Sequence, residues 1–142
     1  MRVLALDLGS KRIGVAVSDF TGTVASPLTV IHRSKSRRHD HDRIAALVRE
    51  EEAELLVIGL PLSLSGDEGP AARAARSEAK AMSSVVGVPI EMHDERLSTV
   101  TAERSLAAAD VRGPARRQVV DKVAAAVFLQ SYLDRRHAAG QG

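Results

Sequence analysis

Cysteine is absent from this sequence, which excludes disulfide bonds and any zinc site built on thiolates. Aromatic residues make up only 2% of the 142 residues, so stacking of bases on an aromatic platform is not the expected mode of nucleic-acid binding. No apolar run approaches the roughly 20 residues that cross a bilayer, and the N-terminus begins as a strand pattern rather than as a signal peptide. We therefore expect a soluble protein of the cytoplasm without membrane contact.

A strong charge of one sign is also missing. Lys and Arg number 20 and Asp and Glu 18, which leaves a formal charge of +2 and no bulk field that demands an anionic partner. Arg greatly outnumbers Lys, however, and guanidinium groups suit bidentate contacts with phosphate. The length and the 44% hydrophobic content predict a single domain over residues 1–137, with a disordered tail at 138–142.

The first forty residues predict three strands joined by short turns. The segment VLALDL is apolar on both faces of a strand except at Asp7, as expected for a central strand that is covered on both sides. The next strand, RIGVAVSD, contains Gly14, which indicates a close approach of another backbone. Pro27 limits the third strand, VASPLTVIHR, to an edge of the sheet or to a late start. Short turns between strands predict an antiparallel meander.

Helices and strands alternate in the remainder of the chain. A helix capped by Asp40 or Asp42 ends near Glu52, and an Ala-rich helix extends from about Ala71 to Val86. The other predicted elements are strands in ELLVIGLP and VPIEMHDE, helices in STVTAERSLAAAD and QVVDKVAAAVFLQSYLDRR, and loops in LSLSGDEGP and VRGPARR. The order predicts an α/β fold: a five-stranded mixed sheet, with a three-strand antiparallel meander plus parallel strands, flanked by helices.

Acidic residues at three places in the chain fall on or beside the buried side of their elements. Asp7 ends a buried strand, and Asp94 and Glu95 end the last strand, where successive residues point to opposite faces. Asp121 begins the apolar stripe of the last helix. Each has an ordinary structural explanation: a turn residue at Asp7, a surface ion pair at Glu95, and a favourable interaction with the helix dipole at Asp121.

Their coincidence favours a shared site. Carboxylates that converge repel one another, and a divalent cation removes that cost. Oxygen ligands without cysteine favour Mg²⁺ or Mn²⁺, bound through a few carboxylates, waters and phosphate oxygens. We therefore predict that Asp7 is a metal ligand.

Other polar groups carry weaker indications. The run HDHD at residues 39–42 is interpreted as a solvated helix start rather than a metal site. His93 is expected to be packed or exposed rather than a proton-transfer group. The arginine pairs at 37–38 and 116–117 either contact phosphates or form solvated surface. The loop LSLSGDEGP either closes over a substrate or simply connects two elements.

The stretches ALDLGSKRIGVAVSD, VIGLPLSLSGDEGP, DERLST and VDKVAAAVFLQSYLD, in this order, resemble the YqgF family, also called RuvX. This family of pre-16S rRNA nucleases belongs to the RNase H-like superfamily, together with the Holliday junction resolvase RuvC. The resemblance implies an RNase H-like fold and an acidic triad of Asp7, Glu95 and Asp121 that serves as metal ligands and catalytic residues. The sequence departs from RuvC-type resolvases at VIGLP, which offers no acid where those enzymes carry one.

The resemblance implies a hydrolase acting on phosphodiester bonds with Mg²⁺ or Mn²⁺, in maturation of the 5′ end of pre-16S rRNA. Lys11, Arg12 and Arg96 lie beside the acids and are predicted to contact nucleic-acid phosphates. A structure-selective nuclease that cuts branched DNA is one alternative, and a non-catalytic nucleic-acid-binding or ribosome-assembly factor is another. Ribosome contact, and a monomeric or homodimeric state, stay open at this point.

Overall fold

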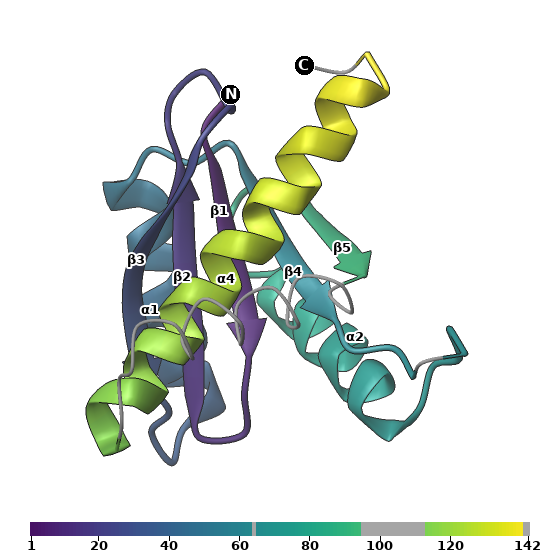
Figure 1. The fold of residues 1–142 in the computed structure, drawn as a ribbon. Helices are drawn as coiled ribbons and strands as arrows, with labels where there is room; N and C mark the ends of the chain where they lie inside the picture. The colour runs from purple at the N-terminus through teal and green to yellow at the C-terminus, as the bar shows by residue number, and fades with distance from the viewer. Residues whose placement is uncertain (64, 95–112, 141–142) are drawn as a thin grey trace.

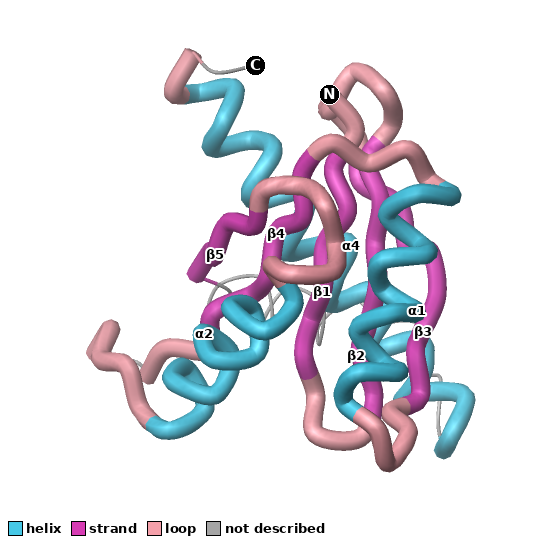
Figure 2. The backbone as a smooth tube through the Cα atoms, turned by 180° about the vertical axis from the view of Figure 1, so that it is seen from behind, coloured by secondary structure: helices cyan, strands magenta, loops and turns pink. Residues whose placement is uncertain are grey.

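A five-stranded sheet with the order β3-β2-β1-β4-β5 forms the centre of the computed structural model, which describes residues 1–63, 65–94 and 113–140, with the backbone alone for 113–120. The strands are β1 (Val3–Leu8), β2 (Arg12–Ser18), β3 (Ala25–His32), β4 (Leu55–Leu60) and β5 (Ile90–Asp94). The helices are α1 (Arg37–Glu50), α2 (Pro70–Met82) and α4 (Gly113–Ala138). Helix α4 crosses one face of the sheet (Figure 1), and α1 and α2 cover the other (Figure 2).

The sheet is mixed, as the sequence predicts. β1 pairs antiparallel with β2 and parallel with β4, and β3 and β5 form the two edges. Pro27 lies in β3, so its missing N–H group falls in an edge strand of the described sheet, where proline is tolerated. The predicted meander of three strands and the parallel strands that follow are both confirmed.

The alternation of β1 divides the apolar core into two layers. Leu4 and Leu6 pack with residues of α1 and α2, among them Ile44 and Met82. The layer on the other face contains the following buried side chains: Val3, Ala5, Ala16, Leu55, Val57, Ala125, Ala126, Phe128, Leu129, Tyr132 and Leu133. Because each face of β1 is buried, its residues are apolar on both sides, and Asp7 is the exception on the α4 side.

Helix boundaries differ from the sequence prediction in three places. Helix α2 ends at Met82 rather than at the predicted Val86, and a turn follows it. Ser36, rather than Asp40 or Asp42, caps α1, because its Oγ accepts a hydrogen bond from His39 N at 3.1 Å. Helix α4 begins at Gly113, so most of the predicted loop VRGPARR is helical, since proline is tolerated in the first turn of a helix.

Two predicted segments lie at or beyond the limits of the described residues. The helix predicted in STVTAERSLAAAD lies outside the described residues. At the C-terminus, α4 includes Ala138 and is followed by a turn at Ala139 and Gly140. No helix in the described parts of the chain is long and apolar enough to cross a membrane.

Gly14 in β2 allows α4 to lie directly on the sheet. A Cβ atom at this position would stand 2.1 Å from the carbonyl oxygen of Asp121 and 2.7 Å from its carbonyl carbon, far inside any real contact. The close backbone approach predicted at this glycine is confirmed, and the neighbour is the residue that the sequence singles out in the last helix.

Replacing Gly14 with alanine is expected to lower the free energy of unfolding by about 1–3 kcal/mol or more, because helix or strand must shift to admit the methyl group. Urea denaturation measures the loss. Gly69→Ala is the matched control, since a Cβ there meets nothing within 4 Å, and its expected cost is below about 1 kcal/mol from the change at the helix cap. Equal stability of the Gly14→Ala variant and the wild type would contradict this account of the contact.

Candidate active site

Asp7 lies in β1 directly across from Gly14 of β2. Residues that face each other in an antiparallel pair point to the same side of the sheet. A Cβ on Gly14 would point at the backbone of α4, so the side chain of Asp7 is directed to the face that α4 covers. Asp7 is partly buried there, one residue before the end of the strand.

Asp121 arrives at the same point from the other side. Its backbone carbonyl lies where a Cβ atom of Gly14 would be. Its carboxylate is mostly shielded, with 22% of the side chain exposed. The antiparallel pair therefore carries one acid, Asp7, and the helix above it carries the second. Two of the three carboxylates predicted from the sequence are brought together by one glycine.

Arg12 balances the charge of the second acid. Its Nε donates a hydrogen bond of 2.6 Å to Asp121 Oδ2 from the first residue of β2. Both side chains are largely shielded, with 27% and 22% exposed, so the pair is stronger than a solvated surface contact. Arg12 is one of the residues predicted to contact phosphate. Lys11, also predicted, is exposed in the turn between β1 and β2.

The carboxyl ends of three parallel strands meet at this edge. β1 pairs with β4, and β4 pairs with β5 as far as Leu60 and Asp94. Glu95 and Arg96, the remaining predicted site residues, lie outside the described residues. Within the described ranges, no three His, Cys, Asp or Glu side chains gather in a way that could hold a metal ion.

The side chain of His93 lies on the face of β5 that packs against α4. Its ring stacks on Phe128, with centroids 5.6 Å apart, and meets the edge of Tyr132 at 5.4 Å. Burial lowers the pKa of His93, the positive charge of Arg135 lowers it further, and nearby carboxylates act in the opposite direction. A packed, neutral ring agrees with the sequence interpretation of this histidine.

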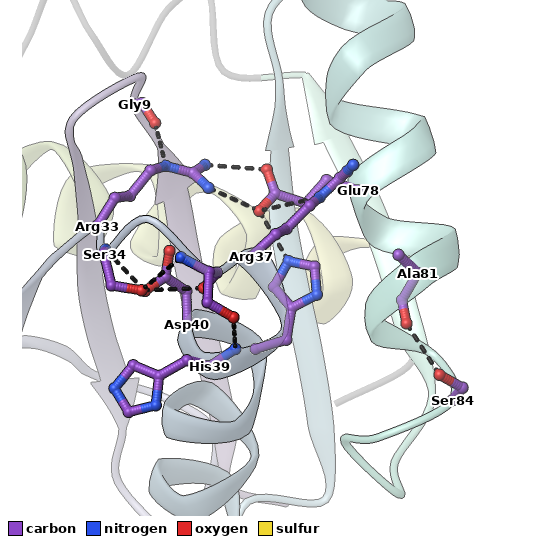
Figure 3. A network of polar contacts seen from close by, with 11 residues as sticks. Gly9, Arg33, Ser34, Arg37, His39, Asp40, Glu78, Ala81 and Ser84 are labelled. Atoms are coloured by element: carbon purple, nitrogen blue, oxygen red, sulfur yellow. Dashed lines mark hydrogen bonds and ion pairs between the residues drawn. The ribbon is translucent and has the colours of Figure 1, made fainter.

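A second group of charges lies on the opposite face, behind the turn that follows Asp7 (Figure 3). Arg33 donates from both terminal nitrogens to Glu78, at 2.8 and 2.9 Å, and from Nε to the carbonyl oxygen of Gly9 at 2.7 Å. His41 Nε2 lies 2.8 Å from Glu78 Oε2, and Asp40 accepts from Ser34 N at 2.9 Å.

This network joins α1, α2 and the end of β3 to the turn after β1. Burial raises the pKa of Glu78, but hydrogen bonds from Arg33 and His41 outweigh that effect, so the pKa falls below its ordinary value of 4.5. The carboxylate thus stays ionised while only 7% of Glu78 is exposed. Because Arg33 also holds Gly9, the network fixes the backbone two residues after Asp7.

The family model described as RuvX, a Holliday junction resolvase, matches residues 1–135. The chain belongs to the RuvX family. A relative from Myxococcus xanthus is 47% identical over 94% of this chain and 88% of its own length, and one from Listeria innocua is 44% identical over 94% and 98%. Both are named "Putative pre-16S rRNA nuclease".

Among solved structures, the fold of this RuvX-family chain is similar to that of Thermus thermophilus RuvC bound to a Holliday junction substrate. The TM-score is 0.59 at 15% identity, and the match covers 99% of this chain and 97% of the other. At this identity the likeness concerns the fold alone, and it confirms the RNase H-like architecture that the sequence resemblance implied.

Sequence reasoning missed the charge network of this RuvX-family protein. Residues 39–42 are not simply a solvated helix start, because Asp40 and His41 are buried at 1% and 3% exposure. Their partners are distant in sequence, with His41 and Glu78 separated by 37 residues. The one signal available was the placement of Glu78 on the same helical stripe as the buried Ala75, Ala79 and Met82.

Glu78→Gln is expected to lower the free energy of unfolding at pH 7 by on the order of 3 kcal/mol, because it leaves the Arg33 charge without its bidentate partner. The lowered pKa means that the ionised carboxylate stabilises the fold above its ordinary pKa of 4.5 and that this contribution is lost as pH falls through the folded value. The gap between variant and wild type should therefore narrow in urea titrations at progressively lower pH.

Glu68→Gln provides the matched control, since Glu68 pairs with Arg76 at the exposed start of α2. We expect a clearly smaller cost for it than for Glu78→Gln, because water screens an exposed pair. A stability gap for Glu78→Gln that is no larger than this, or that does not depend on pH, would contradict the role assigned to the network.

Proposed function

We propose that this protein is a metal-dependent nuclease that hydrolyses phosphodiester bonds in pre-16S rRNA. The observation that carries the proposal is the meeting of Asp7 and Asp121 at Gly14, on a fold shared with a nuclease family. The names of the relatives support the choice of pre-16S rRNA as the substrate, and the family resemblance of the sequence implies its 5′ end. The residues assigned as catalytic are Asp7, Glu95 and Asp121.

The chemistry of the donor groups suits Mg²⁺ or Mn²⁺. Asp7 and Asp121 offer hard carboxylate oxygens at one point, and the sequence contains no cysteine that would attract a softer metal. Glu95 is assigned as the third ligand because it follows His93 by two residues. Side chains alternate along a strand, and the ring of His93 packs against α4. A divalent ion supplies charge stabilisation and lowers the pKa of bound water.

The protein's own residues then position the substrate. Asp7 and Asp121 would hold the divalent ion, which would supply charge stabilisation beside the reacting phosphate. Arg12 keeps Asp121 in place and brings a positive charge beside the site, and Lys11 extends from the adjoining turn. Together with Arg96, these side chains offer contacts to the scissile and flanking phosphates.

A second candidate, cleavage of branched DNA, is favoured by the description of the family model as a Holliday junction resolvase. One feature argues against it. β4 ends in Gly59 and Leu60 and is followed by Pro61, so no carboxylate stands at this strand end, where RuvC-type resolvases carry an acid. Direct comparison of the two substrates separates the candidates.

The test is cleavage of a labelled 16S precursor RNA, its DNA equivalent and a four-way DNA junction, each with Mn²⁺ or Mg²⁺. We expect metal-dependent cutting of the RNA, lost by more than about a hundredfold in Asp7→Asn, Glu95→Gln and Asp121→Asn, because even groups outside the coordination sphere change activity 10- to 100-fold. Cutting of the junction alone would establish the second candidate instead.

Two neutralising substitutions serve as matched controls for these variants. Asp134→Asn makes the same chemical change on an exposed part of α4, and Asp94→Asn makes it at the residue before Glu95. Both should keep wild-type activity within a few-fold. If all variants cleave like the wild type, the carboxylates are structural and the metal-dependent mechanism is wrong.

A further inference from the structure

A cavity of about 450 Å³ opens at the carboxyl end of β1, on the face opposite Asp7. Its wall comes from the turn after β1, the start of α1 and the first turns of α2. We propose that this cavity binds one nucleotide of the substrate RNA strand and that Arg37 contacts its phosphate. The inference rests on the proposed function, because it assigns a second contact to the same substrate.

The cavity lies where the chain connections diverge. Leu8 and Gly9 line it from the end of β1, and Pro61 lines it from the end of the adjacent parallel strand β4. From these two ends, β1 continues into β2 on one side and β4 continues through α2 to β5 on the other. Ligands of α/β sheets bind in the crevice at such a switch point, because no connection covers it.

The charge of the cavity favours an anion. Glu78 lines it, but both of its oxygens accept hydrogen bonds from Arg33, and one also lies 2.8 Å from His41. Arg37 stands only at the edge of this group, with its Nε 4.0 Å from Glu78 Oε2 and 52% of its side chain exposed. Its guanidinium therefore contributes a positive charge beside an acid that Arg33 already neutralises (Figure 3).

Size and lining fit a nucleotide rather than a bare ion. The volume falls within the range of roughly 300–1,000 Å³ that is usual for small-molecule sites. Ala71, Ala74 and Ala75 form the α2 side, where their small methyl groups leave room for a sugar or base. Ser10 adds a hydroxyl group at the mouth of the turn. Few polar groups in an otherwise apolar wall are what positions such a ligand.

Proximity connects the cavity to the acids. Gly9 follows Asp7 by two residues, which is about 7 Å along an extended chain. Asp7 faces α4 and the cavity faces α1 and α2, so an RNA strand that crosses this edge of the sheet passes from one to the other. Neighbouring phosphates of the same strand can then contact the acidic site and Arg37.

The experiment measures binding without cleavage. In an Asp7→Asn background with EDTA, a fluorescein-labelled single-stranded RNA of 16S precursor sequence is titrated by fluorescence anisotropy. Arg37→Gln should weaken binding about tenfold, the effect of one charge-assisted contact, and should reduce the slope of log K against log salt by about 0.7. Arg49→Gln, the same change at the other end of α1, should alter neither quantity.

A second pair of variants tests the cavity itself. Ala74→Glu places a carboxylate in the lining and should also weaken RNA binding, whereas Ser77→Glu adds the same charge to an exposed position of α2 outside it. A merely unfolded Arg37→Gln variant is recognised by its thermal unfolding transition. Unchanged RNA affinity in both Arg37→Gln and Ala74→Glu would overturn the proposal.

A free nucleotide carries the same phosphate group as the RNA strand and is the other possible ligand of the cavity. Isothermal titration calorimetry with adenosine 5′-monophosphate distinguishes the two ligands. If Arg37→Gln abolishes binding of this nucleotide and leaves RNA affinity unchanged, the assignment to the RNA strand is overturned. The binding result is independent of catalysis. Failure of the nuclease assay would leave these affinities interpretable, and failure of the Arg37 test would leave the acids of the nuclease site untouched.

Discussion

The contact between α4 and β2 at Gly14 determines where the functional groups of this protein lie. A helix normally packs on a sheet through side chains, which keep the two backbones apart. At Gly14 the carbonyl of Asp121 occupies the space that a Cβ would need, so the backbones of the helix and the strand are in direct contact. The register of β1 and β2 puts Asp7 at the same point. Carboxylates directed to the same region of the sheet repel each other, and the pair of Arg12 with Asp121 offsets part of that repulsion.

On the opposite face of the sheet, charged side chains hold the turn after Asp7 in place. Buried ion pairs add little net stability, since removing charges from water costs about as much as their attraction returns. Their effect here is geometric. The guanidinium group of Arg33 binds both oxygens of Glu78 and the carbonyl of Gly9. This one planar group therefore links α2 to the turn between β1 and β2. The strand end that carries Asp7 is therefore fixed from both faces of the sheet.

The sequence predicted those features that depend on local periodicity. Alternation in β1 identified Asp7 as an exception on a buried strand, the stripe of α4 identified Asp121, and the glycine in β2 indicated the backbone contact that joins them. The charge network escaped prediction because it depends on distant partners. Arg33 and Glu78 are 45 residues apart, and nothing near Asp40 or His41 in the sequence shows that the second helix will cover them. A polar run at a helix start has the same composition whether it faces solvent or a buried glutamate.

The groups gathered at this edge also constrain how a substrate is selected. Arg12, Lys11 and Arg37 suit phosphate oxygens, which are the same in every sequence, and contacts to phosphate position a strand without identifying its bases. Base recognition on single-stranded RNA usually depends on aromatic stacking, and this chain has only 2% aromatic residues. Phe128 and Tyr132 are buried in the core, and the exposed Phe20 lies beside Met1, at the opposite end of β1 from Asp7. We therefore expect the proposed nuclease to select RNA by its shape and accessibility. In the proposed arrangement, preference for one end of the precursor would follow from where a single strand can reach the acids and the cavity together.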